Sequence, residues 1–139
     1  MRPASRLVLI VEDDPALLAA MKRHLVGDGF EVFTAYDCQT ALAQLQATPP
    51  DVACIDLCLP DESGYELCER IRQQALLCFV PIVVTSERAF PEDMARAEEA
   101  GANAFLKKPF SMQLLTLTLE MLATGITESR PPMRRLRWG

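Results

Sequence analysis

The sequence predicts an α/β fold built around a doubly wound, five-stranded parallel sheet with helices on both faces. Short apolar runs recur along the 139 residues, and each is followed by a segment with apolar residues at helical spacing. Strand and helix together repeat roughly every 25 residues, which is enough for one strand, one helix and two short loops. Such alternation is typical of parallel βαβ units, whose right-handed crossovers place helices on both faces of the sheet.

Five apolar or β-branched segments predict the strands. The continuous run Leu7–Val11 indicates a central strand buried on both faces, whereas the more polar Glu31–Ala35 suits an edge. The five expected strands are Leu7–Val11, Glu31–Ala35, the run from Val52 to Asp56, Val80–Thr85 and Ala104–Leu106.

Helix signals follow each strand. Asp14 and Pro15 have the residue types of an N-cap and a first helical position, and Gly27 and Gly29 end that helix. Ser111 suits the N-cap of the last helix. The expected helices run from residue 15 to the glycines at 27 and 29, then over residues 38–47, 63–74, 91–100 and 111–123.

Composition argues against several classes of function. A net charge of −5 gives no general attraction for nucleic acid, and the apolar runs are far shorter than the roughly 20 residues of a membrane span. Five cysteines without a C-x-x-C pair, together with a single histidine, argue for free thiols in a reducing compartment and against a zinc site. We therefore expect a cytoplasmic protein with no membrane and no direct nucleic-acid contact.

The C-terminal residues differ from the rest of the chain. Residues 124–139 contain four arginines and show neither helical nor strand periodicity. We expect residues 6–123 to form the domain and residues 124–139 to form a basic, flexible tail. A docking tail, or a linker to a further module, is the alternative interpretation.

Polar side chains lie at or directly after the C-terminal ends of four predicted strands. In chain order they are Glu12, Asp13, Asp56, Thr85 and Lys108. Because the carboxyl ends of parallel strands meet at one edge of a sheet, we expect these side chains to lie close together there. That edge is where open α/β sheets bind ligands.

This set of residue types predicts phosphoryl chemistry. Three carboxylates held together repel one another unless a cation lies among them, and their hard oxygen atoms favour Mg²⁺, with Mn²⁺ or Ca²⁺ as alternatives. Lys108 and Thr85 offer an ammonium and a hydroxyl to phosphoryl oxygens. The pattern fits a carboxylate nucleophile, Asp56, that attacks phosphorus while metal and lysine neutralise the developing charge.

Four motifs occur in order along the chain. They are Val11-Glu-Asp-Asp14, Asp56-Leu-Cys-Leu-Pro60 with Gly64, Pro81-Ile-Val-Val-Thr85-Ser86, and Gly101-Ala102 through Phe105-Leu-Lys-Lys-Pro-Phe110. At these spacings the chain resembles the receiver domain of bacterial two-component response regulators, from about Arg6 to Ala123. The resemblance implies a flavodoxin-like topology with strand order 2-1-3-4-5 and a signalling domain without separate enzymatic turnover.

The resemblance also implies roles for the matching residues. Asp56 would be the phosphoacceptor, which receives a phosphoryl group from a phosphohistidine on a sensor histidine kinase or a histidine phosphotransfer protein. Mg²⁺, or Mn²⁺ in its place, would be held by Glu12, Asp13, Asp56 and the backbone carbonyl of Cys58. Lys108, which precedes a cis-proline in this family, would contact the phosphate.

Two further residues would form the switch. Thr85 would hydrogen-bond the phosphoryl group, and Phe105 would turn inward. The surface of the fourth helix, fifth strand and fifth helix would then change, so that it regulates partners or forms a homodimer. Cys58 and Glu87, two residues beyond Asp56 and Thr85, would tune the lifetime of the phosphorylated state.

Alternative functions are an excised N-terminal piece of a multidomain regulator and, more remotely, a Mg²⁺-dependent phosphohydrolase that forms an aspartyl-phosphate. Enzymes of the haloacid dehalogenase type usually carry a second aspartate two residues after the nucleophile, where this chain has Cys58. A flavin-binding function lacks support, because the acidic loop after the first strand would repel a phosphate group.

Overall fold

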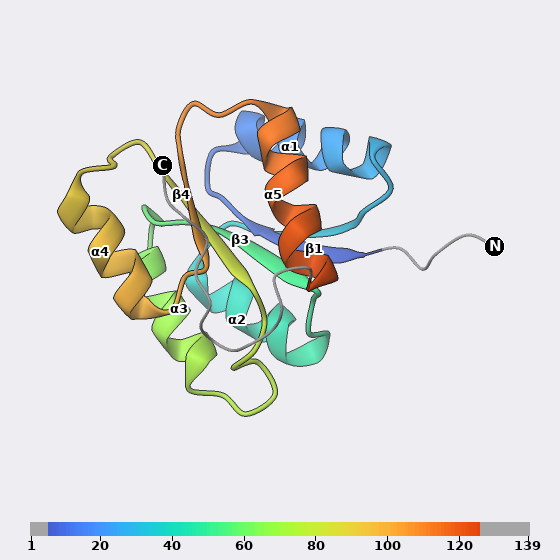
Figure 1. Ribbon diagram of the computed structural model, residues 1–139. Helices are drawn as coiled ribbons and strands as arrows, with labels where there is room; N and C mark the ends of the chain where they lie inside the picture. The colour runs from blue at the N-terminus through green and yellow to red at the C-terminus, as the bar shows by residue number, and fades with distance from the viewer. Residues whose placement is uncertain (1–5, 126–139) are drawn as a thin grey trace.

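The computed structural model describes residues 6–125 as five strands that alternate with five helices (Figure 1). The strands are β1 (Leu7–Val11), β2 (Glu31–Ala35), β3 (Val52–Asp56), β4 (Ile82–Ser86) and β5 (Ala104–Lys107). The helices are α1 (Pro15–Gly27), α2 (Cys38–Ala47), α3 (Gly64–Arg72), α4 (Pro91–Ala100) and α5 (Met112–Thr124).

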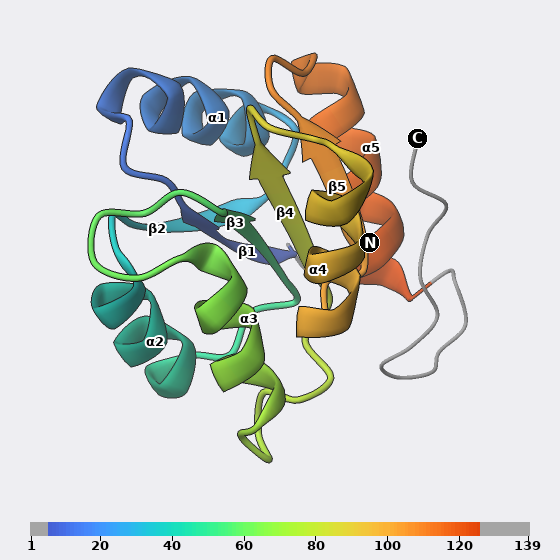
Figure 2. The ribbon, with the colours of Figure 1, turned by 90° about the vertical axis from the view of Figure 1, so that its left-hand side faces the viewer.

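All neighbouring strands pair in parallel, in the order β2-β1-β3-β4-β5 (Figure 2). The predicted fold class and strand order are therefore confirmed. Within the sheet, β2 and β5 are the edge strands, and β1, β3 and β4 lie between them. The three inner strands contain the longest apolar runs because both of their faces are covered.

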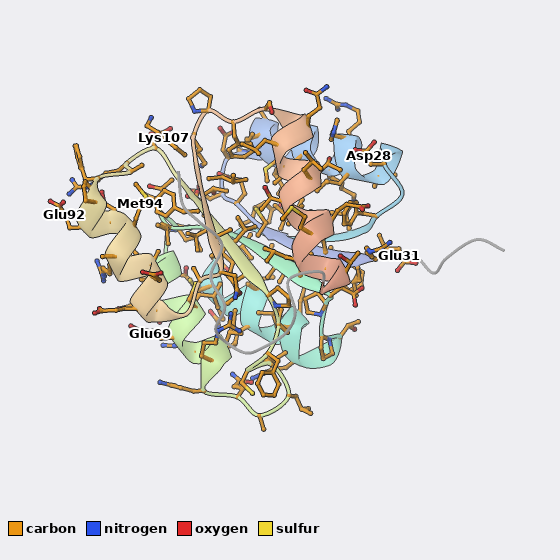
Figure 3. The ribbon with its side chains drawn as sticks, viewed as in Figure 1. Asp28, Glu31, Glu69, Glu92, Met94 and Lys107 are labelled. Carbon is orange, nitrogen blue, oxygen red and sulfur yellow. The ribbon has the colours of Figure 1, made fainter. Side chains whose placement is uncertain are left out.

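Alternate residues of each inner strand enter two separate cores. On β1, Val8 and Ile10 pack with the buried faces of α1 and α5, whereas Leu9 and Val11 pack with α2, α3 and α4. The helices are anchored by fully buried leucines such as Leu25 on one side and Leu67 on the other. The charged side chains of Glu69, Glu92 and Lys107 lie outside these cores (Figure 3).

The element boundaries differ from the predicted ones between the third helix and the fourth strand. Helix α3 ends at Arg72 instead of continuing to Gln74, and the next residues form short turns that place Leu77 in the core. Strand β4 begins at Ile82 instead of Val80. Pro81 has no N–H group to add to the ladder, although its carbonyl still accepts a bond from Ala53.

The five cysteines are free thiols, as predicted. Cys54 and Cys68 lie in the two cores, and burial raises the pKa of each thiol to about 12. Cys58 is the exposed one. In the part of the chain that the structure describes, no helix combines the length and apolar character needed to cross a bilayer. Apart from Thr124 and Gly125, the expected C-terminal tail lies outside the described residues.

Candidate functional site

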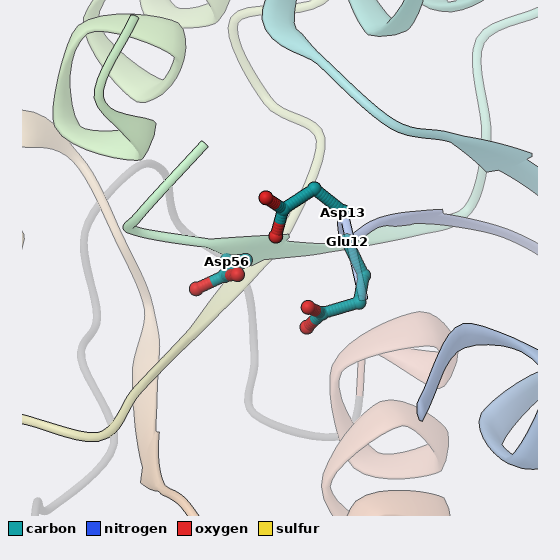
Figure 4. A group of neighbouring side chains, drawn as sticks. All are labelled: Glu12, Asp13 and Asp56. Carbon is teal, nitrogen blue, oxygen red and sulfur yellow. The ribbon is translucent and has the colours of Figure 1, made fainter. Parts of the chain in front are cut away.

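The polar side chains predicted at the C-terminal ends of the strands lie together at the carboxyl edge of the sheet. Glu12 and Asp13 follow β1, and Asp56 is the last residue of β3, so the three enter the same space from adjacent strands (Figure 4). Each offers a carboxylate oxygen, and these atoms all lie within 4.8 Å of one another. Glu12 and Asp56 are only 2% and 3% exposed, whereas Asp13 is open to solvent.

Lys108 provides the positive charge next to this group. Its Nζ lies 3.0 Å from Glu12 Oε1 and 3.3 Å from Asp56 Oδ2. The backbone N–H of Lys108 donates to the Ser86 carbonyl at 2.8 Å, which holds the loop after β5 against the end of β4. The Lys108–Pro109 peptide bond is cis, as the resemblance implied. One lysine therefore bridges the acids that end two neighbouring strands.

Burial and charge act together on these groups. Burial raises the pKa of Glu12 and the nearby charge of Asp56 adds to that effect, while hydrogen bonds from Lys108 and Asp14 offset part of it. For Lys108, burial alone would lower the pKa. The hydrogen bond to Glu12 and the charge of Asp56 outweigh it, so the pKa lies above its ordinary value of 10.5. The ammonium is thus held in its charged form beside the acids.

The free energy of unfolding should reflect the raised pKa of Glu12. In the metal-free protein, the folded state binds more protons at Glu12 than the unfolded chain does between the ordinary pKa of 4.5 and the raised value. The contribution of Glu12 to stability therefore falls as the pH rises through this window. Wild type should lose stability relative to Glu12→Gln over that range in urea unfolding. A difference that stays constant with pH would contradict the assignment.

Asp56 is fixed by its backbone and by both of its oxygen atoms. Oδ2 faces Lys108, and Oδ1 accepts a hydrogen bond from the Cys58 backbone N–H at 3.1 Å. In the sheet register Asp56 pairs with Thr85, and the next N–H, of Leu57, donates to the Thr85 carbonyl at 3.0 Å. The Thr85 side chain is therefore held at the same edge as the carboxylate, and the residue is 1% exposed.

Gly64 allows the loop after β3 to close. A Cβ atom at this position would lie 2.7 Å from the Leu57 Cα and would also collide with the Asp56 carbonyl oxygen. The glycine N–H donates to the Leu57 carbonyl at 2.9 Å, which closes the loop immediately after the acceptor strand. Only a residue without a side chain allows this approach of two backbone segments.

Gly64→Ala should therefore destabilise the protein by about 1–3 kcal/mol, because backbone atoms cannot move aside as the end of a flexible side chain can. Gly27→Ala is a matched control, since a Cβ at residue 27 meets nothing within 4 Å. Urea unfolding of both variants provides the comparison. Equal effects of the two substitutions would show that the close approach at Gly64 is unimportant.

The remaining predicted residues do not belong to the acid group, although the backbone N–H of Cys58 contacts Asp56. Phe105 is half-buried and packs against the core that α2, α3 and α4 cover. Cys58 and Glu87 are exposed on the loops that follow β3 and β4. Lys107 is exposed beside Lys108, as expected for a solvated neighbour.

One residue with long-range contacts, Asp61, was not singled out as a site residue from the sequence. The Asp61 carboxylate, in the loop after β3, accepts hydrogen bonds from the backbone at the start of α2. An aspartate after a proline and before a helix is an ordinary turn signal, so nothing local distinguishes this one. Its partners on α2 are more than twenty residues away in sequence, and only the folded structure brings them together.

Comparison with known protein families gives one consistent match. A family model described as "Response regulator receiver domain" matches residues 8–120. Among curated proteins, the KDP operon transcriptional regulatory protein KdpE of Escherichia coli (strain K12) is 38% identical over 114 residues, which cover 82% of this chain and 49% of KdpE. The chain thus spans about half the length of the curated relatives it matches.

Solved structures agree with this match. The chemotaxis response regulator CheY4 of Vibrio cholerae has a TM-score of 0.81 and 31% identity, covering 85% of this chain and 98% of that one. The receiver domain of sensor histidine kinase PA1611 from Pseudomonas aeruginosa has a TM-score of 0.81 and 28% identity, covering 87% and 99%. The latter structure has a magnesium ion coordinated in its active-site cleft.

Proposed function

Since this chain belongs to the response regulator receiver domain family, we propose that it is a signalling switch that changes state when Asp56 accepts a phosphoryl group. The donor would be a phosphohistidine on a sensor histidine kinase or a histidine phosphotransfer protein. The observation that carries the proposal is the placement of Asp56, a buried carboxylate with one oxygen beside the Lys108 ammonium and two further acids within reach.

The acids fit a divalent metal ion. Glu12, Asp13 and Asp56 present hard oxygen atoms within 4.8 Å of one another, and an exposed Asp13 leaves the group open on one side for water or phosphate oxygens. These three residues and the backbone carbonyl of Cys58 would hold Mg²⁺, or Mn²⁺ in its place. When bound, the ion would neutralise charge on the phosphoryl oxygens. The magnesium ion in the PA1611 receiver domain supports this choice.

The side chains divide the chemistry between them. A carboxylate oxygen of Asp56 forms the new bond to phosphorus as the bond from phosphorus to the donor nitrogen breaks, and the donor imidazole keeps the electron pair. The Lys108 ammonium would offset the negative charge that grows on the phosphoryl oxygens. Thr85, at the end of the neighbouring strand, would donate its hydroxyl to the bound phosphoryl group.

The readout would be the surface formed by α4, β5 and α5. Phosphorylation would draw Thr85 toward the acceptor and Phe105 inward from its half-buried position. Exposed apolar residues on α5, with Leu117 60% exposed and Leu114 47% exposed, support a protein contact on this surface. That contact would be a regulated partner or a second copy of the chain. Free thiols support a cytoplasmic setting for these events.

An excised N-terminal piece of a longer regulator is the alternative for the chain as a whole. Its span of about half of each curated relative favours this possibility. A phosphohydrolase that turns over external esters is less well supported, because the position two residues after Asp56 is Cys58 and offers no carboxylic acid as a proton donor.

Labelling with acetyl phosphate tests the proposal. With Mg²⁺ present, the protein should take up one phosphoryl group per chain, and chelation of the metal should abolish uptake. Intact-mass measurement follows the reaction. No uptake with Mg²⁺ would contradict the switch, and repeated turnover of an aryl phosphate would favour the phosphohydrolase instead.

A further inference from the structure

A carboxylate joins the loop after β3 to the beginning of α2. Asp61 Oδ1 accepts hydrogen bonds from the Cys38 N–H at 2.9 Å and from the Glu62 N–H at 2.9 Å, and Oδ2 accepts one from the Gln39 N–H at 3.1 Å. Both oxygen atoms are therefore used, and two of the three donors belong to a helix that follows a different strand. The side chain is a bridge between elements that are separated in sequence.

The start of α2 is a favourable place for this charge. The first N–H groups of a helix have no partner within the helix, and its positive dipole end attracts an anion. Asp37, the N-cap of α2, satisfies only the Thr40 N–H, at 2.9 Å. Asp61 satisfies the two N–H groups before it. Desolvation of Asp61 opposes the charged form, but these hydrogen bonds outweigh it and lower the pKa of the carboxyl group.

The bridged loop contains the Cys58 carbonyl, which would be a ligand of the metal ion at the phosphorylation site. It leaves β3 at Asp56, where the Cys58 N–H donates to Asp56 Oδ1, and it returns at Gly64. Cys58 also forms an isolated antiparallel bridge with Ser63 across the loop. Residues 59–62 join these two fixed ends of the loop, directly after Cys58.

The other contacts of residues 59–62 constrain the loop conformation less. Leu59 is partly buried against the core, the Cys38 thiol lies 3.5 Å from the Glu62 carbonyl, and Arg70 forms an ion pair with Glu62 that is half open to solvent. An apolar contact and an exposed ion pair leave the loop orientation loosely defined. The two hydrogen bonds that Asp61 accepts from the Cys38 and Gln39 N–H groups hold the loop against α2 more firmly.

We propose that Asp61 is a positioning residue for the phosphorylation site: it ties the loop after β3 to α2 and so holds the Cys58 carbonyl in place for the divalent metal ion. This inference rests on the proposed function, since it concerns the same metal. Asp61 itself does not belong to the acid group formed by Glu12, Asp13 and Asp56. Its effect on the metal is therefore indirect.

Two variants at the start of α2 separate positioning from simple helix stabilisation. Asp37→Ala and Asp61→Ala each remove a carboxylate from the start of α2, but only the second releases the loop. Mg²⁺ affinity is measured by isothermal titration calorimetry and stability by urea unfolding. Both variants should unfold at lower urea, and Asp61→Ala alone should bind Mg²⁺ about 3–10-fold more weakly, a smaller loss than the roughly 10–100-fold effect of partners bonded directly to a metal ligand.

Asp61→Asn refines the test and covers the case in which the alanine variant does not fold. Its single side-chain oxygen can replace Oδ1 but not both acceptors, so its Mg²⁺ affinity should fall between those of wild type and Asp61→Ala. Labelling by acetyl phosphate gives a second readout. At saturating Mg²⁺ the Asp61 variants should regain the wild-type rate, because the acceptor and Lys108 are unchanged.

The failures are distinguishable. Wild-type protein that binds no Mg²⁺ would overturn the proposed function and this inference with it. Wild type that binds Mg²⁺ while the Asp61 variants bind it equally well would overturn only the positioning role. Equal losses of affinity in Asp37→Ala and Asp61→Ala would likewise overturn it, since helix stability would then account for both.

Discussion

Lys108→Ala should slow the phosphorylation of Asp56 by a factor of about 10²–10³, the usual cost of removing one preorganised charge-stabilising group. Its Nζ lies 3.3 Å from the acceptor oxygen Oδ2, in a position to meet the phosphoryl oxygens as they gain negative charge. Alanine leaves the nucleophile and all three acids in place. The rate of acetyl phosphate labelling at saturating Mg²⁺ measures the loss.

The same substitution should lower the stability of the metal-free protein by about 3 kcal/mol, because it leaves buried acids without their cation. The ammonium lies 3.0 Å from Glu12 Oε1, and both side chains are largely shielded from solvent. Added Mg²⁺ should restore more stability to this variant than to wild type. Lys107→Ala is the matched control, since its neighbouring side chain is exposed. If Lys107→Ala and Lys108→Ala are labelled by acetyl phosphate at similar rates, then Lys108 does not assist the phosphoryl transfer.

Asp56→Asn should abolish phosphorylation altogether, because an amide oxygen is too weak a nucleophile to replace the carboxylate. Asparagine keeps the size of the side chain and an oxygen for the Cys58 N–H. The fold should therefore persist, as circular dichroism would show. Labelling is compared with wild type and with Glu99→Gln, in which an exposed acid of α4 is neutralised instead.

Undiminished labelling of Asp56→Asn would mean that another residue accepts the phosphoryl group. Asp13 is the first candidate in that event, since it belongs to the same acid group and is exposed. Loss of labelling in Glu99→Gln as well would point to a general effect of charge. Either result would remove Asp56 from its assigned role.

The sequence predicts the sheet and the acid group for one physical reason. Residues buried on both faces of an inner strand must be apolar, so Leu7–Val11 stands out, and the first charged residue after it marks the edge. Glu12, Asp13 and Asp56 are therefore found without any structure. Parallel pairing then requires them to be neighbours, as β1 and β3 confirm.

Contacts between distant loops could not be predicted in this way. That Lys108 pairs with Glu12 as well as Asp56 depends on how the chain leaves β5. The hydrogen bonds that Asp61 accepts from α2 depend on the path of another loop. The early end of α3 has the same origin. Leu77 enters the core only if the helix stops, and tertiary packing outweighs local helix propensity there.

The central claim is that Asp56, and no other carboxylate, carries the phosphoryl group. Reduction with borohydride tests it most directly, because an acyl phosphate on aspartate is converted to homoserine and leaves a permanent mark in the chain. After treatment with acetyl phosphate and Mg²⁺, peptide mass spectrometry should find homoserine at position 56 alone, and none when the metal is chelated. Homoserine at position 13, or at no position, would contradict the account.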